Sequence, residues 1–356
     1  MKFSHILILL LILTNSCSKI SDEVATIISE NEMYFPPVFS EQWETITPSE
    51  LNWNTQEIEP LLNYLEANNT KSFIVLYNGR IAIEQYFNGH SESKNWYWAS
   101  AGKTLTSITI GIAEENSLIN INDKVSDYLG TGWTSLPTDK ENLITCKHLL
   151  TMSSGIDDSF GDSVNPLDLK YKADAGTRWA YHNVYVKLQD IIEASSGQSF
   201  TNYFNTNLKD KIGMTGLWLK TGDFNVYFST TRSMARFGLL ALNKGTWNTT
   251  KIVNERFFNA SVNTSQNLNE AYGYLWWLNG KSSYHLPQSQ FKFQGKLIPN
   301  APTDLYAALG KNDQKIYVSP SKNLVIIRMG ESSEGTNFAL SNFDNELWEK
   351  LNLIIN

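Results

Sequence analysis

The stretch Trp96-Tyr-Trp-Ala-Ser-Ala-Gly-Lys103 carries the strongest chemical signal in the sequence. Ser-x-x-Lys occurs five times along the chain, but only Ser100 and Lys103 stand at the start of an amphipathic helical pattern, which runs to about Glu115. Residues three apart on a helix share a face, which brings the lysine amine within reach of the serine hydroxyl. The positive end of the helix dipole opposes a protonated lysine and favours an ionising serine. The segment therefore predicts either an activated serine nucleophile or a capping serine followed by a solvated lysine.

Outward from this helix, strand patterns lie towards both ends of the chain. Residues 72–77 and 81–87 flank Asn78-Gly79, a dipeptide typical of a tight β-hairpin turn. Further strand patterns cover 272–278, 303–309, 314–318 and 323–329, and a closing helix is predicted over 337–355. We therefore predict an α/β (α+β) fold, in which one antiparallel sheet from both chain ends is flanked by helices and an all-helical lobe is inserted between the two groups of strands.

The chain of 356 residues is predicted to divide into three parts. Residues 1–16 are expected to be a signal peptide. Residues 17–50, which are rich in Ser, Glu, Thr and Pro, are expected to form a tether. Residues 51–356 are expected to form one domain, with a sheet lobe over about 51–124 and 265–356 and a helical lobe over about 125–264.

The N-terminus has the pattern of an export signal. After Lys2, residues 6–13 form an unbroken run of eight aliphatic residues. Eight helical residues at about 1.5 Å each cannot cross a hydrocarbon core of about 30 Å, so this run predicts a signal peptide. A small residue before Cys17 resembles a bacterial lipoprotein signal, in which the cysteine is lipidated; ordinary cleavage nearby is the alternative. Either outcome predicts an exported protein. Lipidation further predicts a protein of the bacterial cell envelope, in the periplasm or at the outer membrane, whose membrane contact is the lipid on Cys17.

Composition and residue spacing argue against several function classes. The 29 Lys and Arg residues are outnumbered by 36 Asp and Glu, and no basic run appears, so we expect no nucleic-acid partner. Two cysteines cannot build a disulfide framework or a thiolate zinc site. After the signal peptide, no two histidines have ligand spacing. The sequence therefore predicts chemistry without a metal or a cofactor.

A second motif favours the catalytic interpretation of Ser100. The segment Gly176-Thr-Arg-Trp-Ala-Tyr-His-Asn183 contains Tyr181 and Asn183 in a Tyr-x-Asn pattern. Together with other segments in the same order, it resembles the serine β-lactamase and penicillin-binding-protein superfamily, and is most similar to class C β-lactamase-like hydrolases such as esterases and 6-aminohexanoate-dimer hydrolases. The resemblance runs from about residue 70 to the C-terminus. The segments that carry it are Ser100–Lys103, Ile144–Ile156, Tyr181–Asn183, Ser233–Gly238 and Gln314–Pro320.

The resemblance implies a role for each of the matching residues. Ser100 would attack a carbonyl carbon and form an acyl-enzyme, while Lys103 and Tyr181 would share the proton transfers. The proton acceptor would be either a neutral amine or a phenolate. Asn183 would hydrogen-bond Lys103 or the substrate, whereas His182 is expected to be a packed or surface residue.

The third family motif departs from the usual pattern. Where members carry Lys-Thr-Gly or His-x-Gly on the strand beside the nucleophile, this chain has Ala308-Leu-Gly310. Gly310 suits a strand that must let substrate approach its backbone. The N–H of Lys311 is expected to complete an oxyanion hole with that of Ser100, and its side chain to face solvent. Because no cation stands at position 308, a β-lactam with its carboxylate should bind poorly.

These motifs predict an exported serine hydrolase that acts on a small ester or amide through an acyl-Ser100 intermediate. Within the same class, the alternative is a D-alanyl carboxypeptidase or β-lactamase acting on cell-wall-like substrates. From another class, the alternative is a ligand-binding or sensor module without activity. The tryptophans that flank the motifs are expected mainly in the core, with one or two lining an apolar acyl pocket.

Overall fold

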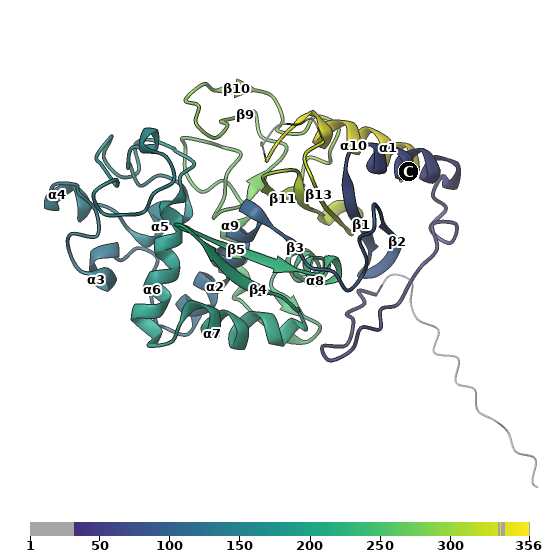
Figure 1. Ribbon diagram of the computed structural model, residues 1–356, viewed down its shortest axis with the longest axis horizontal. Coiled ribbons are helices and arrows are strands. Elements are labelled where there is room, and N and C mark those ends of the chain that lie inside the picture. The colour runs from purple at the N-terminus through teal and green to yellow at the C-terminus, as the bar shows by residue number, and fades with distance from the viewer. Residues whose placement is uncertain (1–31, 334, 336–338, 356) are drawn as a thin grey trace, which may run out of the picture. The chain divides into compact units, whose positions relative to one another are not determined.

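The computed structural model describes residues 32–333, 335 and 339–355, and the part from Met33 onward forms one compact unit. Its centre is a six-stranded antiparallel sheet (Figure 1). In chain order the strands are β1 (Thr70–Tyr77), β2 (Arg80–Tyr86), β8 (Trp277–Leu278), β11 (Tyr306–Gly310), β12 (Gln314–Ser319) and β13 (Leu324–Gly330). Their order across the sheet is β2-β1-β13-β12-β11-β8, so strands from distant parts of the chain lie side by side. The predicted sheet from both chain ends is confirmed.

The turn between β1 and β2 shows why the hairpin could be recognised from the sequence. Asn78 and Gly79 have φ values of 46° and 82°, and positive φ at both central residues suits the twist of a two-residue hairpin. Gly79 is also required by space, because a Cβ there would lie 1.9 Å from the carbonyl oxygen of Tyr34. Local turn chemistry and packing therefore favour the same residue.

Helices cover both faces of the sheet. Helices α1 (Ile58–Ala67) and α10 (Asn342–Ile354) pack together on one face, and α8 (Thr231–Leu242) packs on the other. Successive side chains of a strand point to opposite faces, and β12 follows this rule. Tyr317 donates a hydrogen bond to Asp344 of α10, whereas Ile316 lies under α8, 3.3 Å from where a Cβ of Gly238 would stand.

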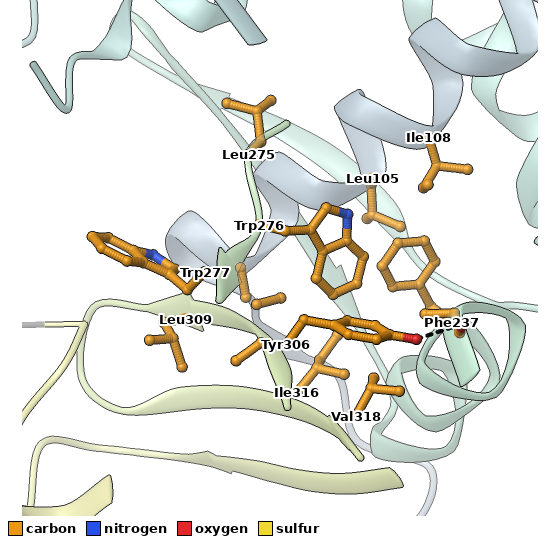
Figure 2. Close-up of a cluster of buried hydrophobic side chains, with 14 of the residues drawn as sticks. Leu105, Ile108, Phe237, Leu275, Trp276, Trp277, Tyr306, Leu309, Ile316 and Val318 are labelled. Atoms are coloured by element: carbon orange, nitrogen blue, oxygen red, sulfur yellow. Dashed lines mark hydrogen bonds between the residues drawn. The ribbon is translucent and has the colours of Figure 1, made fainter. Parts of the chain in front are cut away.

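A buried aromatic cluster fixes the helix that follows Ser100 against the sheet (Figure 2). Helix α2 (Lys103–Glu115) contributes Leu105 to this cluster. Trp276 stacks on Phe237 of α8 at 5.9 Å and meets Tyr306 of β11 edge to face at 5.5 Å. The Tyr306 hydroxyl donates to a carbonyl of α8, at Ala241, over 2.8 Å. The cluster therefore holds α2, α8 and β11 in one arrangement.

The insert between the two groups of strands is rich in helices, but it also contains strands. Its helices are α3 (Val125–Leu129), α4 (Thr138–Glu141), α5 (Cys146–Leu150), α6 (Lys187–Ser196), α7 (Phe200–Phe204), α8 and α9 (Glu255–Ser261). Its strands are β4 (Leu217–Thr221), β5 (Phe224–Ser229), β6 (Thr246–Trp247) and β7 (Thr250–Lys251), and β5 pairs with β3 (Trp96–Tyr97) just before Ser100. The prediction of an all-helical insert therefore needs this correction. A half-buried strand usually alternates apolar and polar residues. In β4 this alternation is absent from the sequence, because Leu217 and Leu219 are apolar although exposed, while Trp218 between them is buried.

Two other predicted boundaries differ from the structure. The strand predicted over 272–278 is shorter, and only Trp277–Leu278 pairs in the sheet. Leu275 has a φ of 64°, which is incompatible with a β-strand and ends it on that side. The closing helix begins at Asn342 rather than at residue 337. A short pair, β9 (Ser283–Tyr284) and β10 (Phe293–Gln294), was not predicted.

The described part of the expected tether, from Met33 to residue 50, packs against the domain. Ile46 N–H donates to the carbonyl of Ile81, and Ile81 N–H donates to that of Glu44, both at 3.0 Å. The Arg236 guanidinium donates to the carbonyls of Pro37 and Ser40. The expected signal peptide and Cys17 lie outside the described residues. Within the described part of the chain, no helix is long and apolar enough to cross a membrane.

Candidate active site

Ser100 lies on a strained turn between β3 and α2. The turn η2 (Ala99–Gly102) is a short 3-10 helix, and Ala99 has a φ of 48°, a region that residues with a Cβ rarely adopt. Hydrogen bonds hold the segment: Trp98 N–H donates to the carbonyl of Tyr227 on β5, and Ala101 N–H donates to that of Trp98. Strain that is held in place by surrounding structure is a frequent property of functional sites.

Lys103 is directly next to Ser100. Its Nζ lies 2.9 Å from the Ser100 Oγ, so the structure brings the two residues together as the i, i+3 spacing predicts. The Lys103 side chain is almost fully buried, with 5 % of the residue exposed. This burial lowers the pKa of Lys103 to about 7, although the negative charge of Asp162 acts in the opposite direction. A large fraction of the amine is therefore neutral at physiological pH and able to accept a proton.

Tyr181 completes the group around the serine. The Lys103 Nζ lies 4.9 Å from the centre of the Tyr181 ring and 4.4 Å from that of Tyr185. Burial of the Tyr181 phenol raises its pKa, and the negative charge of Asp162 raises that pKa further. A hydrogen bond with Ser100 acts in the opposite direction and lowers the pKa of Tyr181. Tyr181 is therefore a neutral phenol near pH 7. Of the two proton acceptors considered from the sequence, the neutral amine of Lys103 is the one that this electrostatic environment favours.

Asn183 is held by backbone groups on two loops. Its Nδ2 donates to the carbonyl oxygens of Asp162 at 2.9 Å and Asp223 at 3.0 Å. Both amide hydrogens are thus used, and the buried Oδ1 has no hydrogen-bond partner among the described residues. Of the two partners predicted for Asn183, Lys103 or the substrate, Lys103 is not bonded to it in this structure.

His182 is packed away from the chemistry, as the sequence indicated. Its Nε2 donates to the carbonyl of Gly161 at 2.9 Å, and its Nδ1 accepts from the N–H of Val184. These two bonds assign the neutral tautomer with hydrogen on Nε2. Burial lowers the pKa of His182, which also favours the neutral ring.

The strand beside the nucleophile has the expected glycine and lacks a cation at position 308. Gly310 ends β11 next to η2, and Ala308, two residues earlier on the same face, is buried. The side chain of Lys311 is exposed in the turn that follows. This exposure agrees with the expectation that the Lys311 side chain faces solvent.

Sequence reasoning missed the buried charges that support this turn. Lys315 has no exposed surface, and its Nζ lies 3.1 Å from a carboxylate oxygen of Asp313 and 2.7 Å from one of Asp344. Asn312, in the same turn, donates from Nδ2 to the Tyr97 hydroxyl at 2.7 Å. Asp344 belongs to α10, so no local pattern could have revealed the pair. The group ties the turn after Gly310 to α10 and to the segment before Ser100.

Other aromatic rings pack against the ring of Tyr181. Trp277 stacks on Tyr181 with ring centres 5.8 Å apart, and Tyr272 meets Trp277 edge to face at 4.9 Å. Trp179 and Trp277 are both buried, and Trp96 is half-buried. The tryptophans near Tyr181 therefore belong to the core, as expected for most of them. Among the described residues, no group of three or more His, Cys, Asp or Glu is arranged to hold a metal ion.

Comparison with known proteins agrees with this fold. The Beta-lactamase family model matches residues 68–346, so the chain belongs to the Beta-lactamase family. An uncharacterized protein of Alkalihalophilus pseudofirmus is 24 % identical over 309 residues, covering 75 % of this chain and 86 % of that protein.

Two solved structures have the same fold. A protein described as a 6-aminohexanoate-dimer hydrolase, from Bacillus anthracis, has a TM-score of 0.68 at 20 % identity, covering 91 % of this chain and 89 % of its own. A protein described as a β-lactamase, from Bacteroides dorei, has a TM-score of 0.66 at 15 % identity, covering 85 % and 99 %. At these identities the similarity shows the fold, and the roles of the individual site residues stay predictions.

Proposed function

We propose that this protein is a serine hydrolase that cleaves a small ester or amide through an acyl-Ser100 intermediate. The observation that carries the proposal is the 2.9 Å contact between Ser100 Oγ and the Nζ of Lys103, whose pKa burial lowers to about 7. A serine hydroxyl becomes an effective nucleophile when an adjacent base accepts its proton. If Ser100 only capped the helix, nothing would require a buried lysine without a carboxylate partner beside it.

In acylation, the Ser100 Oγ bonds to the substrate carbonyl carbon while its proton passes to the neutral Lys103 amine. The backbone N–H groups of Ser100 and Lys311 stabilise the resulting oxyanion. The Lys103 ammonium then returns the proton through the Tyr181 hydroxyl to the leaving alkoxide or amine, as its bond to the carbonyl carbon breaks. Water next attacks the acyl carbon, loses its proton to Lys103, and displaces Ser100, which regains a proton as the acid leaves.

Ester or linear amide substrates are favoured over β-lactams. Ala308 is buried and uncharged on the same strand face as Gly310, and the Lys311 side chain is exposed in the turn. A hydrogen bond to a carboxylate contributes about 1.5–3 kcal/mol, so its absence weakens β-lactam recognition by about tenfold to a hundredfold. A D-alanyl carboxypeptidase or β-lactamase activity is the alternative, and the structural similarity to a protein described as a β-lactamase favours testing it.

The test compares three probes on the purified protein: a fluorophosphonate, a fluorescent penicillin and p-nitrophenyl esters of rising chain length. We expect fluorophosphonate labelling and ester hydrolysis that are lost in Ser100→Ala. Ser91→Ala is the matched control, because Ser91 begins another Ser-x-x-Lys pattern and its hydroxyl lies beside that of Ser93 on the surface. Equal labelling of Ser100→Ala and the wild type would exclude Ser100 as the nucleophile. Rapid turnover of penicillin with little ester hydrolysis would instead support the β-lactamase alternative.

We also propose, from the sequence, that the protein is exported to the bacterial cell envelope and anchored by a lipid on Cys17. The supporting features are the aliphatic run before Cys17 and the small residue that precedes it. Cys17→Ala should move the protein from the membrane fraction to the soluble fraction of cells. Cys146→Ala is the control, since Cys146 is a buried cysteine of α5. A Cys17→Ala protein that stays with the membranes would refute the lipid anchor.

A further inference from the structure

We propose that Tyr185 is a positioning residue, whose ring face holds the Lys103 amine beside Ser100 and sets the pH range over which that amine can act as the base. The inference rests on the proposed function, because it concerns the base of that reaction. Tyr185 acts through Lys103, whose Nζ lies over its ring.

The geometry of the amine carries the proposal. Lys103 forms no ion pair among the described residues, and its hydrogen bond runs to Ser100. Its Nζ lies 4.4 Å from the centre of the Tyr185 ring, closer than the 4.9 Å to the ring of Tyr181. A cation within about 6 Å of an aromatic face is attracted by the electron-rich ring. Two ring faces therefore take the place that a carboxylate occupies around most buried lysines.

The backbone that presents Asn183 also presents Tyr185. Both residues belong to η4 (Asn183–Val186), a 3-10 turn that begins directly after Tyr181 and His182. Asn183 is anchored to two loop carbonyls, and Tyr185 has only 4 % of its surface exposed. The ring is thus enclosed and cannot turn away without disturbing the motif. This makes Tyr185 a fixed part of the lysine environment.

Few other groups act on the Lys103 charge. The carboxylate of Asp162, on the loop before Tyr181, is the charged group that raises its pKa, and the neutral Tyr272 phenol interacts with both Tyr181 and Tyr185. Further along α2, Gln189 of α6 bonds to Thr106, and Phe257 of α9 faces Gly111. The turn η5 (Asn205–Lys209) also packs on α2, and its Lys209 pairs with Asp210. Apart from the Ser100 hydroxyl at 2.9 Å, the two aromatic faces are therefore the close groups that favour the ammonium.

The direction of the effect follows from opposing contributions. Burial lowers the pKa of Lys103 to about 7, whereas the ring faces favour the protonated form. Removing the Tyr185 face should lower the pKa of Lys103 further, by about 0.4 to 1.5 units. Tyr185→Met removes the face while filling much of the same space, because methionine adapts to irregular gaps. Tyr185→Phe is the matched control, because it keeps the ring and loses only the hydroxyl.

The experiment measures the Lys103 titration directly. The protein is labelled with ¹³C at the lysine ε carbons, and the Lys103 signal is identified by its absence in Lys103→Met. We expect the same midpoint in the wild type and Tyr185→Phe, and a lower one in Tyr185→Met. An unchanged or raised midpoint in Tyr185→Met would overturn the proposal, as would an equal shift in both variants. If Tyr185→Met does not fold, phenylalanines with increasing fluorination at position 185 weaken the ring face at nearly constant shape, and the midpoint should fall with each fluorine.

A second measurement separates this proposal from the proposed function. The rate of Ser100 labelling by a fluorophosphonate is followed from pH 5 to 9 in the same variants. At pH 6, we expect Tyr185→Met to retain a larger fraction of its maximal labelling rate than Tyr185→Phe does, because a lower pKa of Lys103 leaves more of the amine neutral. Absence of labelling in the wild type at every pH would refute the proposed function, whereas the lysine titration would still decide the role of Tyr185.

Discussion

Gly310 lies so close to Trp98 that a methyl group on its Cα would stand 2.4 Å from the Trp98 carbonyl oxygen. The same methyl group would lie 3.0 Å from the backbone nitrogen of Ala101. Both atoms belong to the backbone around Ser100, so neither can move aside cheaply. The absence of a side chain at Gly310 therefore allows β11 to lie against the turn that carries Ser100.

Gly310→Ala should separate these two segments and displace the Lys311 N–H from the oxyanion position. Because small misplacements of reacting groups are costly, we expect kcat/KM for a p-nitrophenyl ester to fall about a hundredfold. The control is Gly102→Ala, in the same turn, where an added Cβ would meet its nearest neighbours at 3.7–3.8 Å. A similar loss in both variants would show that the close approach at Gly310 is not the cause.

The rate of Ser100 acylation should depend on pH through Lys103. The reaction needs the neutral amine, and burial lowers the pKa of Lys103 to about 7. The labelling rate should therefore reach half its maximum near pH 7 and fall about tenfold per pH unit below that. Stopped-flow or gel-based labelling from pH 5 to 9 measures the profile. Lys103→Arg should be inactive throughout, because a guanidinium keeps its proton. A flat wild-type profile would contradict the role of Lys103 as the base.

Lys103→Met should stabilise the protein while abolishing activity. In the folded state the pKa of Lys103 falls from 10.5 to about 7, so at pH 6 the folded protein carries a buried charge that the unfolded chain exposes to water. Removing it should raise the free energy of unfolding at pH 6 by about 2–4 kcal/mol. The gain should shrink as the pH rises from 7 towards 10.5, because the folded protein then binds fewer protons than the unfolded chain.

Urea unfolding of Lys103→Met at pH 6 and pH 9.5 measures this change. Lys311→Met is the control, because the Lys311 side chain is exposed and its loss should change the free energy of unfolding by less than about 0.5 kcal/mol. A gain that is equal at the two pH values would show that packing, rather than the buried charge, is responsible.

Asp344→Asn should destabilise the protein strongly. It removes one of the two carboxylates that neutralise the fully buried Lys315. It also puts an NH2 donor in place of one of the two oxygens that accept from Lys315 and Tyr317. Loss of one partner from a buried ion pair costs about 3 kcal/mol or more. Asp210→Asn is the matched control, because the Asp210 side chain is exposed and its contact with Lys209 should contribute less than about 1 kcal/mol. Equal effects in urea unfolding would argue against the buried pair as a support of the turn after Gly310.

Local rules were enough for part of the fold. The Asn78-Gly79 turn needs positive φ at two successive residues, and this requirement is visible in the dipeptide itself. The strands β12 and β13 consist of buried runs bounded by turn residues, so their extents were predicted to within about a residue. The strands β4 and β5 were missed, because exposed apolar residues, Leu217 and Leu219 in β4 and Phe224 in β5, hide the alternation that a half-buried strand usually shows.

By itself, the sequence determined which reacting groups are present and the local spacing that brings Ser100 and Lys103 onto one turn. It also placed Tyr181 and Asn183 in one motif and showed that position 308 has no cation. The tertiary structure alone decided how these groups behave. The lowered pKa of Lys103 and the ring of Tyr185 over its amine arise from packing between segments far apart in the chain. Desolvation and ring contacts depend on distances across the core, and no local pattern specifies those distances.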